Sequence, residues 1–166
     1  VVDKIILPGV GTYGDCVNRL IQKNLLISLK EQILIKQKYF LGICVGMQIL
    51  SEFGFEFEKY SGMGLIKGNV KKFQKENNNL IPHIGWSNLK FNVQSSLFKN
   101  INEASYFYFV HSYYFEVIDK NHVSSFAYNG IEFAASVEKQ NIFGVQFHPE
   151  KSQKDGLQLL KNFENI

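Results

Sequence analysis

A cysteine flanked by two glycines follows a short apolar run, and this feature constrains the fold more than any other. The segment reads Gly42-Ile43-Cys44-Val45-Gly46 and overlaps the end of the apolar run 39–43. A nucleophile elbow, the sharp turn between a strand and a helix, holds its central residue on strained backbone, where a side chain at either flank would collide with its neighbours. The segment therefore predicts an α/β fold in which Cys44 projects from the end of a buried strand.

Helical patterns alternate with short apolar runs in the first part of the chain. We expect buried strands at 4–7 and 39–43, and helices at about 13–23, 25–37 and 46–53. Strands of this kind are typical of a parallel sheet whose two faces are covered by helices.

The second part of the chain is richer in β-forming residues. We expect strands in the β-rich runs at 105–110, 113–118, 123–128, 131–137 and 142–147, which turn residues such as Asn129-Gly130 separate. Residues 65–73 show partial alternation of apolar and polar residues, and an amphipathic helix is expected at about 154–163. The predicted fold class is α/β, with a mixed, mostly parallel sheet flanked by helices and an antiparallel extension.

Composition indicates one globular domain. The chain has 166 residues, of which 45% are hydrophobic and 20% charged, and its asparagine run at 77–79 is too short for a domain linker. The longest apolar run, 39–50, is interrupted by Gly42, Gly46 and Gln48, so we expect no membrane span. Two cysteines form no disulfide framework and the N-terminus is not a secretory signal, which favours a reducing cytoplasm.

The charge pattern argues against a nucleic-acid partner. The formal net charge is +3, and Arg19 is the only arginine among the 18 basic residues. Recognition of bases and phosphates relies on bidentate arginine, and the sequence has no basic stripe with interleaved aromatic residues.

Cys44 has the sequence context of a nucleophile. The N-terminus of the helix that follows would favour the thiolate, so we expect the pKa of Cys44 to lie below that of a free cysteine. The backbone N–H of Val45 could donate to the oxyanion of a tetrahedral intermediate. The alternative is a buried, inert cysteine in a glycine-rich turn.

His148 and Glu150 could be the partners of that nucleophile. They lie two residues apart, so extended backbone would project both side chains to the same side, and Pro149 fixes the backbone between them. An imidazole oriented by a carboxylate is the proton carrier that a cysteine nucleophile needs. A His-Pro-Glu segment alone is more often a solvated loop, but its coexistence with the elbow favours a catalytic triad.

A glycine-rich turn follows the first predicted strand. Pro8-Gly9-Val10-Gly11 could supply a second oxyanion donor from the backbone N–H of Val10 or Gly11. The alternative is an ordinary strand-to-helix turn. The turn lacks the Gly-Lys-Ser/Thr sequence of a phosphate-binding loop.

Taken together, these segments resemble the class I (triad) glutamine amidotransferases, and within them the glutaminase subunits of imidazole glycerol phosphate synthase from histidine biosynthesis. The likeness covers nearly the whole chain. In chain order, it is carried by Pro8-Gly9-Val10-Gly11 with Asp15, Leu41-Gly42-Ile43-Cys44-Val45-Gly46-Met47-Gln48, Pro82-His83-Ile84-Gly85-Trp86, Tyr108-Phe109-Val110-His111-Ser112-Tyr113 and Gln146-Phe147-His148-Pro149-Glu150-Lys151-Ser152.

The resemblance implies a flavodoxin-like fold of the amidotransferase class and a set of residue roles. Cys44 would be the nucleophile, His148 the acid and base, and Glu150 the residue that orients His148. Glutamine would be held by Gly11, Gln48 and the backbone at Ser112 and Tyr113. Trp86 and Tyr108 would lie near the ammonia exit, and Lys151 would face the partner. That partner would be a (β/α)₈-barrel synthase (cyclase) subunit in a heterodimer, and the resemblance implies no cofactor and no metal.

Two departures from the family pattern are visible. The family usually begins with a strand-helix-strand unit, whereas this sequence opens on what resembles the third strand. We therefore expect residues 1–166 to be an N-terminally incomplete glutamine amidotransferase type 1 domain, whose strand at 4–7 has an open edge and which aggregates or unfolds at low temperature when expressed alone. In addition, Ser87 stands where an asparagine is common in the histidine-pathway members.

Three alternatives therefore stay open at the level of sequence. A related amidotransferase could feed ammonia to an amino-sugar or surface-glycan synthase. A stand-alone Cys-His-Glu hydrolase could act on γ-glutamyl compounds. A silent interaction module could retain only the fold, although the presence of Cys44, His148 and Glu150 argues against it.

Overall fold

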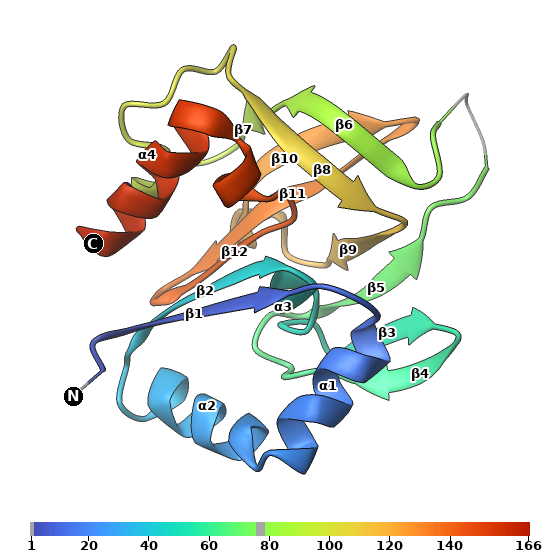
Figure 1. The fold of residues 1–166 in the computed structure, drawn as a ribbon, viewed down its shortest axis with the longest axis vertical. Helices are drawn as coiled ribbons and strands as arrows, with labels where there is room; N and C mark the ends of the chain where they lie inside the picture. The colour runs from blue at the N-terminus through green and yellow to red at the C-terminus, as the bar shows by residue number, and fades with distance from the viewer. Residues whose placement is uncertain (1, 76–78) are drawn as a thin grey trace.

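The computed structural model describes residues 2–75 and 79–166, so part of the asparagine run, 77–78, lies outside the described residues (Figure 1). Within that part of the chain, six strands form the main sheet. Their order is β1 (Lys4–Gly9), β2 (Tyr39–Cys44), β12 (Ile142–Val145), β11 (Ile131–Lys139), β10 (Val123–Asn129) and β7 (Lys90–Phe91). The sheet is mixed, because β1, β2 and β12 pair in parallel and the remaining pairs are antiparallel.

The register of the parallel strands determines where the site forms. Gly9, the last residue of β1, pairs with Cys44, the last residue of β2, and Val145 at the end of β12 pairs with Ile43. Parallel strands have their carboxyl ends at the same edge of the sheet, where ligands of α/β proteins commonly bind. The three segments that follow these strands therefore meet, although up to about 140 positions separate them in the sequence.

Two smaller sheets complete the described part of the fold. A four-stranded sheet has the order β4 (Glu58–Ser61), β3 (Phe53–Glu56), β5 (Gly68–Lys72) and β9 (Tyr113–Val117), and β6 (His83–Asn88) pairs with β8 (Tyr106–His111). Figure 1 shows β9 and β5 beside the end of the main sheet at which β1 leads into the first helix. The β-rich runs expected at 105–110, 113–118, 123–128, 131–137 and 142–147 are all confirmed as strands, within a few residues at their ends.

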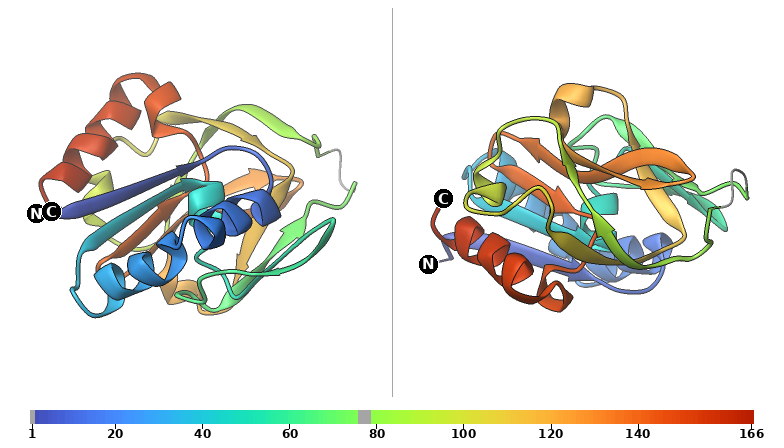
Figure 2. Two further views of the ribbon diagram at one scale, coloured as in Figure 1. Left: turned by 60° about the horizontal axis from the view of Figure 1, so that its bottom comes forward. Right: turned by 90° about the horizontal axis from the view of Figure 1, so that it is seen from above.

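The helices lie on opposite sides of the parallel strands. Figure 2 shows α1 (Tyr13–Gln22) and α2 (Leu25–Leu34) on one side and α4 (Gln153–Glu164) on the other. Three short 3₁₀ helices are η1 (Ser96–Phe98), η2 (Lys120–His122) and η3 (Pro149–Lys151). Thr12 caps α1, since its hydroxyl oxygen accepts a hydrogen bond from Asp15 N. None of the described helices is both long and apolar enough to cross a membrane.

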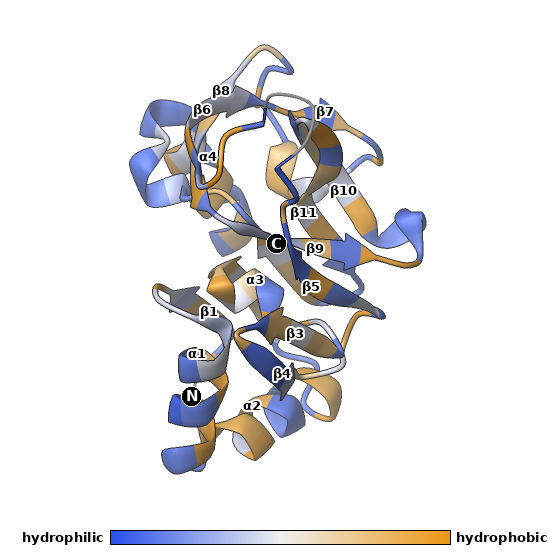
Figure 3. Ribbon diagram, turned by 90° about the vertical axis from the view of Figure 1, so that its right-hand side faces the viewer, coloured by the Kyte–Doolittle hydropathy of each residue, from blue (hydrophilic) through white to orange (hydrophobic). Residues whose placement is uncertain are grey.

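The helix expected at 46–53 is wrong in length. Helix α3 spans only Val45–Gln48, and β3 already begins at Phe53. The carbonyl groups that would continue the helix accept hydrogen bonds from a returning loop instead, because Met63 N donates to Ile49 O and Leu65 N donates to Leu50 O. Figure 3 shows α3, rich in hydrophobic residues, in the middle of the molecule. Tertiary hydrogen bonds therefore override the local helical pattern.

The strand expected at 4–7 is present as β1 and has the open edge that the sequence analysis expects. Strand β1 is paired only with β2 among the described strands, and the side chain of Ile6 is 47% exposed. Ile5 and Leu7 are partly buried against the core.

Candidate active site

The backbone of the elbow is strained at Cys44 and packed too closely for side chains at its two glycines. Cys44 has φ 54° and ψ −112°, an unusual conformation for a residue with a side chain. A Cβ atom added at Gly42 would lie 2.3 Å from Gly46 O, and one added at Gly46 would lie 2.0 Å from Leu7 O. The steric reason inferred for the two glycines is therefore confirmed, since the collisions involve backbone atoms that cannot move aside.

The loop after β1 packs directly on this turn. A Cβ atom added at Gly9 would lie 2.8 Å from Gly46 N, so the loop and the elbow approach each other closely. Gly11 has φ +100°, which favours glycine, and Val10 is 84% exposed while lining the pocket described below. The segment that the sequence offers as a second oxyanion donor thus lies beside the elbow that carries Cys44.

The thiol of Cys44 is not activated in this conformation. Burial raises the pKa of Cys44 to about 11, and the hydrogen bond from Val45 N lowers it by less. The expectation that the pKa would fall below that of a free cysteine is therefore wrong. Helix α3 has only four residues, so its dipole is small, and the side chain is 6% exposed, so the thiolate loses most of its hydration.

His148 is held on extended backbone at the end of the segment that follows β12. Its N–H donates to Tyr108 O at 2.9 Å, and Ser152 Oγ donates to His148 O at 2.6 Å. His148 Nδ1 lies 2.7 Å from Glu150 Oε1, where Nδ1–H donates to the carboxylate. The imidazole is 4% exposed and its Nε2 is the nitrogen left to exchange a proton.

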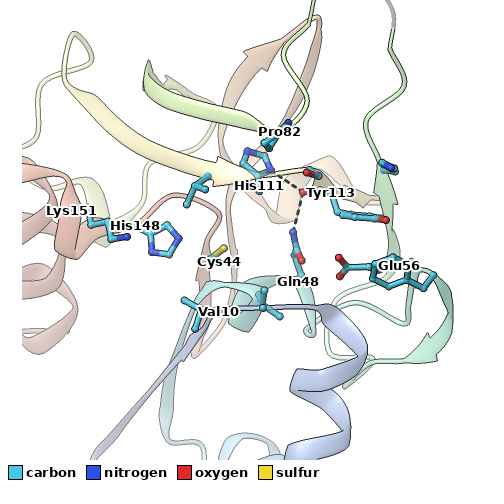
Figure 4. Close-up of a pocket in the computed structure, with 15 residues that line it drawn as sticks. Val10, Cys44, Gln48, Glu56, Pro82, His111, Tyr113, His148 and Lys151 are labelled. Atoms are coloured by element: carbon cyan, nitrogen blue, oxygen red, sulfur yellow. Dashed lines mark hydrogen bonds between the residues drawn. The ribbon is translucent and has the colours of Figure 1, made fainter.

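One pocket of about 530 Å³ brings most of the predicted residues together (Figure 4). Of the residues singled out in the sequence, its lining includes Val10, Gly11, Cys44, Val45, Gln48, Ser112, Tyr113, His148 and Lys151. Figure 4 shows Cys44 between His148 on one side and Gln48 on the other. Glu150, whose carboxylate is hydrogen-bonded to His148 Nδ1, is not part of the described lining.

Sequence reasoning missed Glu56, which lies at the opposite end of the pocket from His148 (Figure 4). Its Oε2 accepts a hydrogen bond from Tyr13 N at 2.7 Å, which holds the carboxylate near the start of α1. Glu56 is the only acidic residue in the described lining. No local pattern marks it, because it ends a strand that the sequence did not predict.

Gln48 is buried rather than solvated. It is 3% exposed, and its Nε2 donates to Tyr113 O and to Gln146 Oε1, both at 3.0 Å. Its expected contact with glutamine is therefore restricted to its Oε1 while these hydrogen bonds persist. Gln146, to which the sequence attached no role, is fully buried, and its Nε2 lies 3.7 Å from Cys44 Sγ.

The residues expected near an ammonia exit form one cluster beside the pocket. Trp86 pairs with Tyr108 across β6 and β8, and their ring centroids are 5.7 Å apart. The Lys151 ammonium lies 5.8 Å from the centre of the Tyr108 ring. Trp86 is 46% exposed, so it belongs to the surface and not to the core.

Comparisons with known proteins agree with this geometry. A family profile described as "Glutamine amidotransferase class-I" matches residues 2–165. The chain is 46% identical to "Imidazole glycerol phosphate synthase subunit HisH 1" of Campylobacter jejuni subsp. jejuni serotype O:23/36 (strain 81-176), over 99% of this chain and 81% of that protein. It is 43% identical to the HisH subunit of Pelagibacter ubique (strain HTCC1062), over 99% of this chain and 80% of that protein.

A solved structure shows the same fold. A crystal structure described as a glutamine amidotransferase superposes with a TM-score of 0.67 at 14% sequence identity, covering 98% of this chain and 80% of that one. The mixed sheet flanked by helices that the sequence predicts is thereby confirmed as the fold class. The expectation that this sheet is mostly parallel is wrong, because three of its five described strand pairs are antiparallel. The chain belongs to the class I glutamine amidotransferase family, in the group of the HisH subunits of imidazole glycerol phosphate synthase.

Proposed function

We propose that this protein is the glutaminase subunit of imidazole glycerol phosphate synthase, which hydrolyses L-glutamine to glutamate and ammonia for histidine biosynthesis. The observation that carries the proposal is one pocket in which Cys44 stands on a strained elbow beside His148, whose imidazole is hydrogen-bonded to Glu150. The sequence identity of 46% and 43% to two HisH subunits, each over 99% of this chain, supports the proposal. The two free cysteines fit a reducing cytoplasm.

The proposed reaction proceeds through a thioester. His148 Nε2 takes the proton of the Cys44 thiol as Sγ attacks the carboxamide carbon of glutamine. The C=O electron pair moves to the oxygen, where backbone N–H groups of Val45 and the Val10–Gly11 turn stabilise it. When this intermediate collapses, the C–N bond breaks and His148 Nε2–H protonates the leaving nitrogen, which departs as ammonia. His148 Nε2 then removes a proton from water as the water oxygen attacks the thioester carbon. When this second intermediate collapses, the C–S bond breaks and His148 returns the proton to the sulfur, which releases glutamate and restores the Cys44 thiol.

The pocket offers complementary charge for the α-ammonium group of glutamine. Glu56 lies opposite His148, so a carboxylate stands at the end away from Cys44, and Lys72 adds an ammonium group to the lining. An amino acid bound with its carboxamide at Cys44 would place its own charged groups toward that end. We propose that Glu56 accepts hydrogen bonds from the glutamine α-ammonium, together with contacts from Gly11, Gln48 Oε1 and the backbone of Ser112 and Tyr113.

Replacing Glu56 with glutamine should raise KM for glutamine about tenfold or more while changing kcat little. The substitution keeps the shape of the side chain and removes its charge, and hydrogen bonds between charged groups contribute about 1.5–3 kcal/mol. Steady-state kinetics over a range of glutamine concentrations would measure this. Glu58→Gln, an exposed residue on the neighbouring strand β4, is the matched control. An unchanged KM in Glu56→Gln would contradict the assigned contact.

A glutamine-like electrophile tests the nucleophile directly. A chloroketone analogue of glutamine should modify Cys44, abolish glutamine hydrolysis and leave Cys16 unmodified, because only Cys44 lines the pocket. Burial also raises the pKa of Cys16, so a difference in general thiol reactivity does not favour Cys44. Peptide mapping by mass spectrometry would locate the label, and excess glutamine should protect Cys44. Equal labelling of the two cysteines would refute the assignment.

The surface beside the pocket favours a subunit over a stand-alone hydrolase. Strands β6 and β8 expose Ile84, Trp86 and Tyr106, which are 51%, 46% and 58% exposed. Aromatic residues of this kind are enriched in protein interfaces. We propose that this face, with Tyr108 and Lys151, binds the (β/α)₈-barrel synthase subunit that receives the ammonia in a heterodimer, because ammonia released into bulk water would be protonated and lost.

A further inference from the structure

A series of hydrogen bonds connects Cys44 to two buried glutamines. Gln146 Nε2 lies 3.7 Å from Cys44 Sγ, and Gln146 Oε1 accepts a hydrogen bond from Gln48 Nε2 at 3.0 Å. Gln48 Nε2 donates its other hydrogen to the carbonyl oxygen of Tyr113. Gln146 is fully buried, so water does not compete for its amide. The nucleophile thus ends a network that begins at a backbone carbonyl.

The chemistry of these groups permits one direction of donation. The Tyr113 carbonyl can only accept, so the Gln48 atom that faces it must be the amide nitrogen. That nitrogen can only donate, so the atom of Gln146 that receives its second hydrogen must be the amide oxygen. The nitrogen of Gln146 is then the atom directed at Cys44 Sγ, where it can act only as a donor.

The Tyr113 carbonyl is held from its other side by a histidine pair. His111 Nδ1 lies 2.8 Å from Tyr113 O and must carry a hydrogen, which leaves His111 Nε2 to accept from His83 Nδ1 at 3.0 Å. His83 Nε2 in turn lies 3.0 Å from Ser87 Oγ. Burial lowers the pKa of His111 to about 3 and also lowers the pKa of His83, so both rings are neutral near pH 7. The direction of the network therefore does not reverse on titration near neutrality.

We propose that Gln146 is a further catalytic residue whose amide N–H stabilises the thiolate of Cys44, and that Gln48 is a positioning residue that keeps this amide directed at the sulfur. The proposal deepens the function proposed above and rests on Cys44 being the nucleophile. A neutral donor suits this position, because a second cation beside the sulfur would compete with protonation of His148. Gln48 would then contribute to catalysis from behind the nucleophile as well as lining the pocket.

The electrostatic surroundings show why such a donor matters. Besides Cys44, the titratable groups that line the described pocket or adjoin it are Glu56 on β3, Lys72 on β5, His111 on β8 and Tyr113 on β9, together with His148, Glu150 and Lys151, which follow β12. Burial is the largest influence on the pKa of Cys44 and raises it, and the charge of Glu150 raises it further. The hydrogen bonds from Val45 N and Gln146 lower it, each by more than the charge of Lys151. The thiolate therefore depends mainly on neutral N–H donors.

The test measures the thiolate without using glutamine. The rate of Cys44 alkylation by iodoacetamide is followed from pH 7 to pH 12 by mass spectrometry of the whole protein and of its Cys44 peptide. Gln146→Met keeps the side-chain length and removes the donor. Because a hydrogen bond to a charged group shifts a titration by about one pH unit, alkylation of this variant at pH 8 should be about tenfold slower. With glutamine as substrate, kcat should fall while KM changes little.

Two further variants separate this role from a structural one. Gln48→Met should move the pH midpoint in the same direction, because the Gln146 amide is then free to rotate. Asn141→Leu removes another buried amide, whose Nδ2 donates to Ile33 O and Lys38 O at the other end of β12, and should leave the midpoint unchanged. A folded Gln146→Met variant with the wild-type midpoint would overturn the proposal. If that variant does not fold, an unchanged midpoint in Gln48→Met would overturn it. Failure of the chloroketone to label Cys44 would instead refute the proposed function.

Discussion

Replacement of His148 by alanine is expected to lower kcat for glutamine hydrolysis by about a thousandfold or more. Without the imidazole, ammonia departs with no proton donor and water attacks the thioester with no general base. Release of glutamate, measured by a coupled dehydrogenase assay with saturating glutamine, would quantify the loss. Glu150→Gln should give a smaller loss, because the amide can still accept from His148 Nδ1–H and the half-exposed position of Glu150 lets water screen its charge.

A matched control for this prediction is His122→Ala. His122 lies on η2, outside the lining of the pocket, and should retain full activity. Chloroketone labelling of Cys44 in the His148→Ala variant would show that the pocket is still formed. A His148→Ala enzyme that keeps more than about a tenth of wild-type kcat would exclude His148 as the acid and base.

Addition of the synthase subunit with its bound ligand is expected to raise glutaminase activity by at least about a hundredfold. With the pKa of Cys44 raised to about 11, only about one thiol in a thousand is ionised at pH 8 in this conformation. The Val10–Gly11 turn, where Val10 is 84% exposed, is the segment that a docked partner could rearrange to complete the oxyanion site. Initial rates with and without the partner would measure the activation.

Substitutions on the surface test whether the partner acts where we propose. Trp86→Ala should weaken the activation by the partner, since the exposed Trp86 ring packs against the Tyr108 ring. The same Tyr108 ring also contacts the Lys151 ammonium group. Ile27→Ala, which removes an 81% exposed apolar side chain on α2, should leave the activation intact. Full activity of the isolated protein, unchanged by the partner, would favour a stand-alone hydrolase.

Local features of the site could be inferred from the sequence because short-range sterics determine them. Gly42 and Gly46 are required because a Cβ atom at either position would lie only 2.0–2.3 Å from a backbone oxygen. Local sequence patterns also predicted β2 and β12 from their apolar runs and α4 from its amphipathic spacing, because each pattern involves only residues close in the chain. These local patterns place the motifs in the chain order of the family, which is why the sequence resembles its members so closely.

The tertiary structure decided what depends on burial and on partners far apart in the chain. Gln146 contacts Cys44, which is 102 positions away in the sequence, and it contacts Gln48, which is 98 positions away. No local sequence pattern relates the two residues of either pair. Glu56 enters the pocket only because β3 pairs with β5 beside the main sheet. The sequence indicated an activated thiol at Cys44, but the pKa of a thiol depends on how much water the fold removes, and here desolvation outweighs the nearby N–H donors. Spacing along the chain singled out Cys44 as the candidate nucleophile, whereas packing in three dimensions sets the pKa of its thiol.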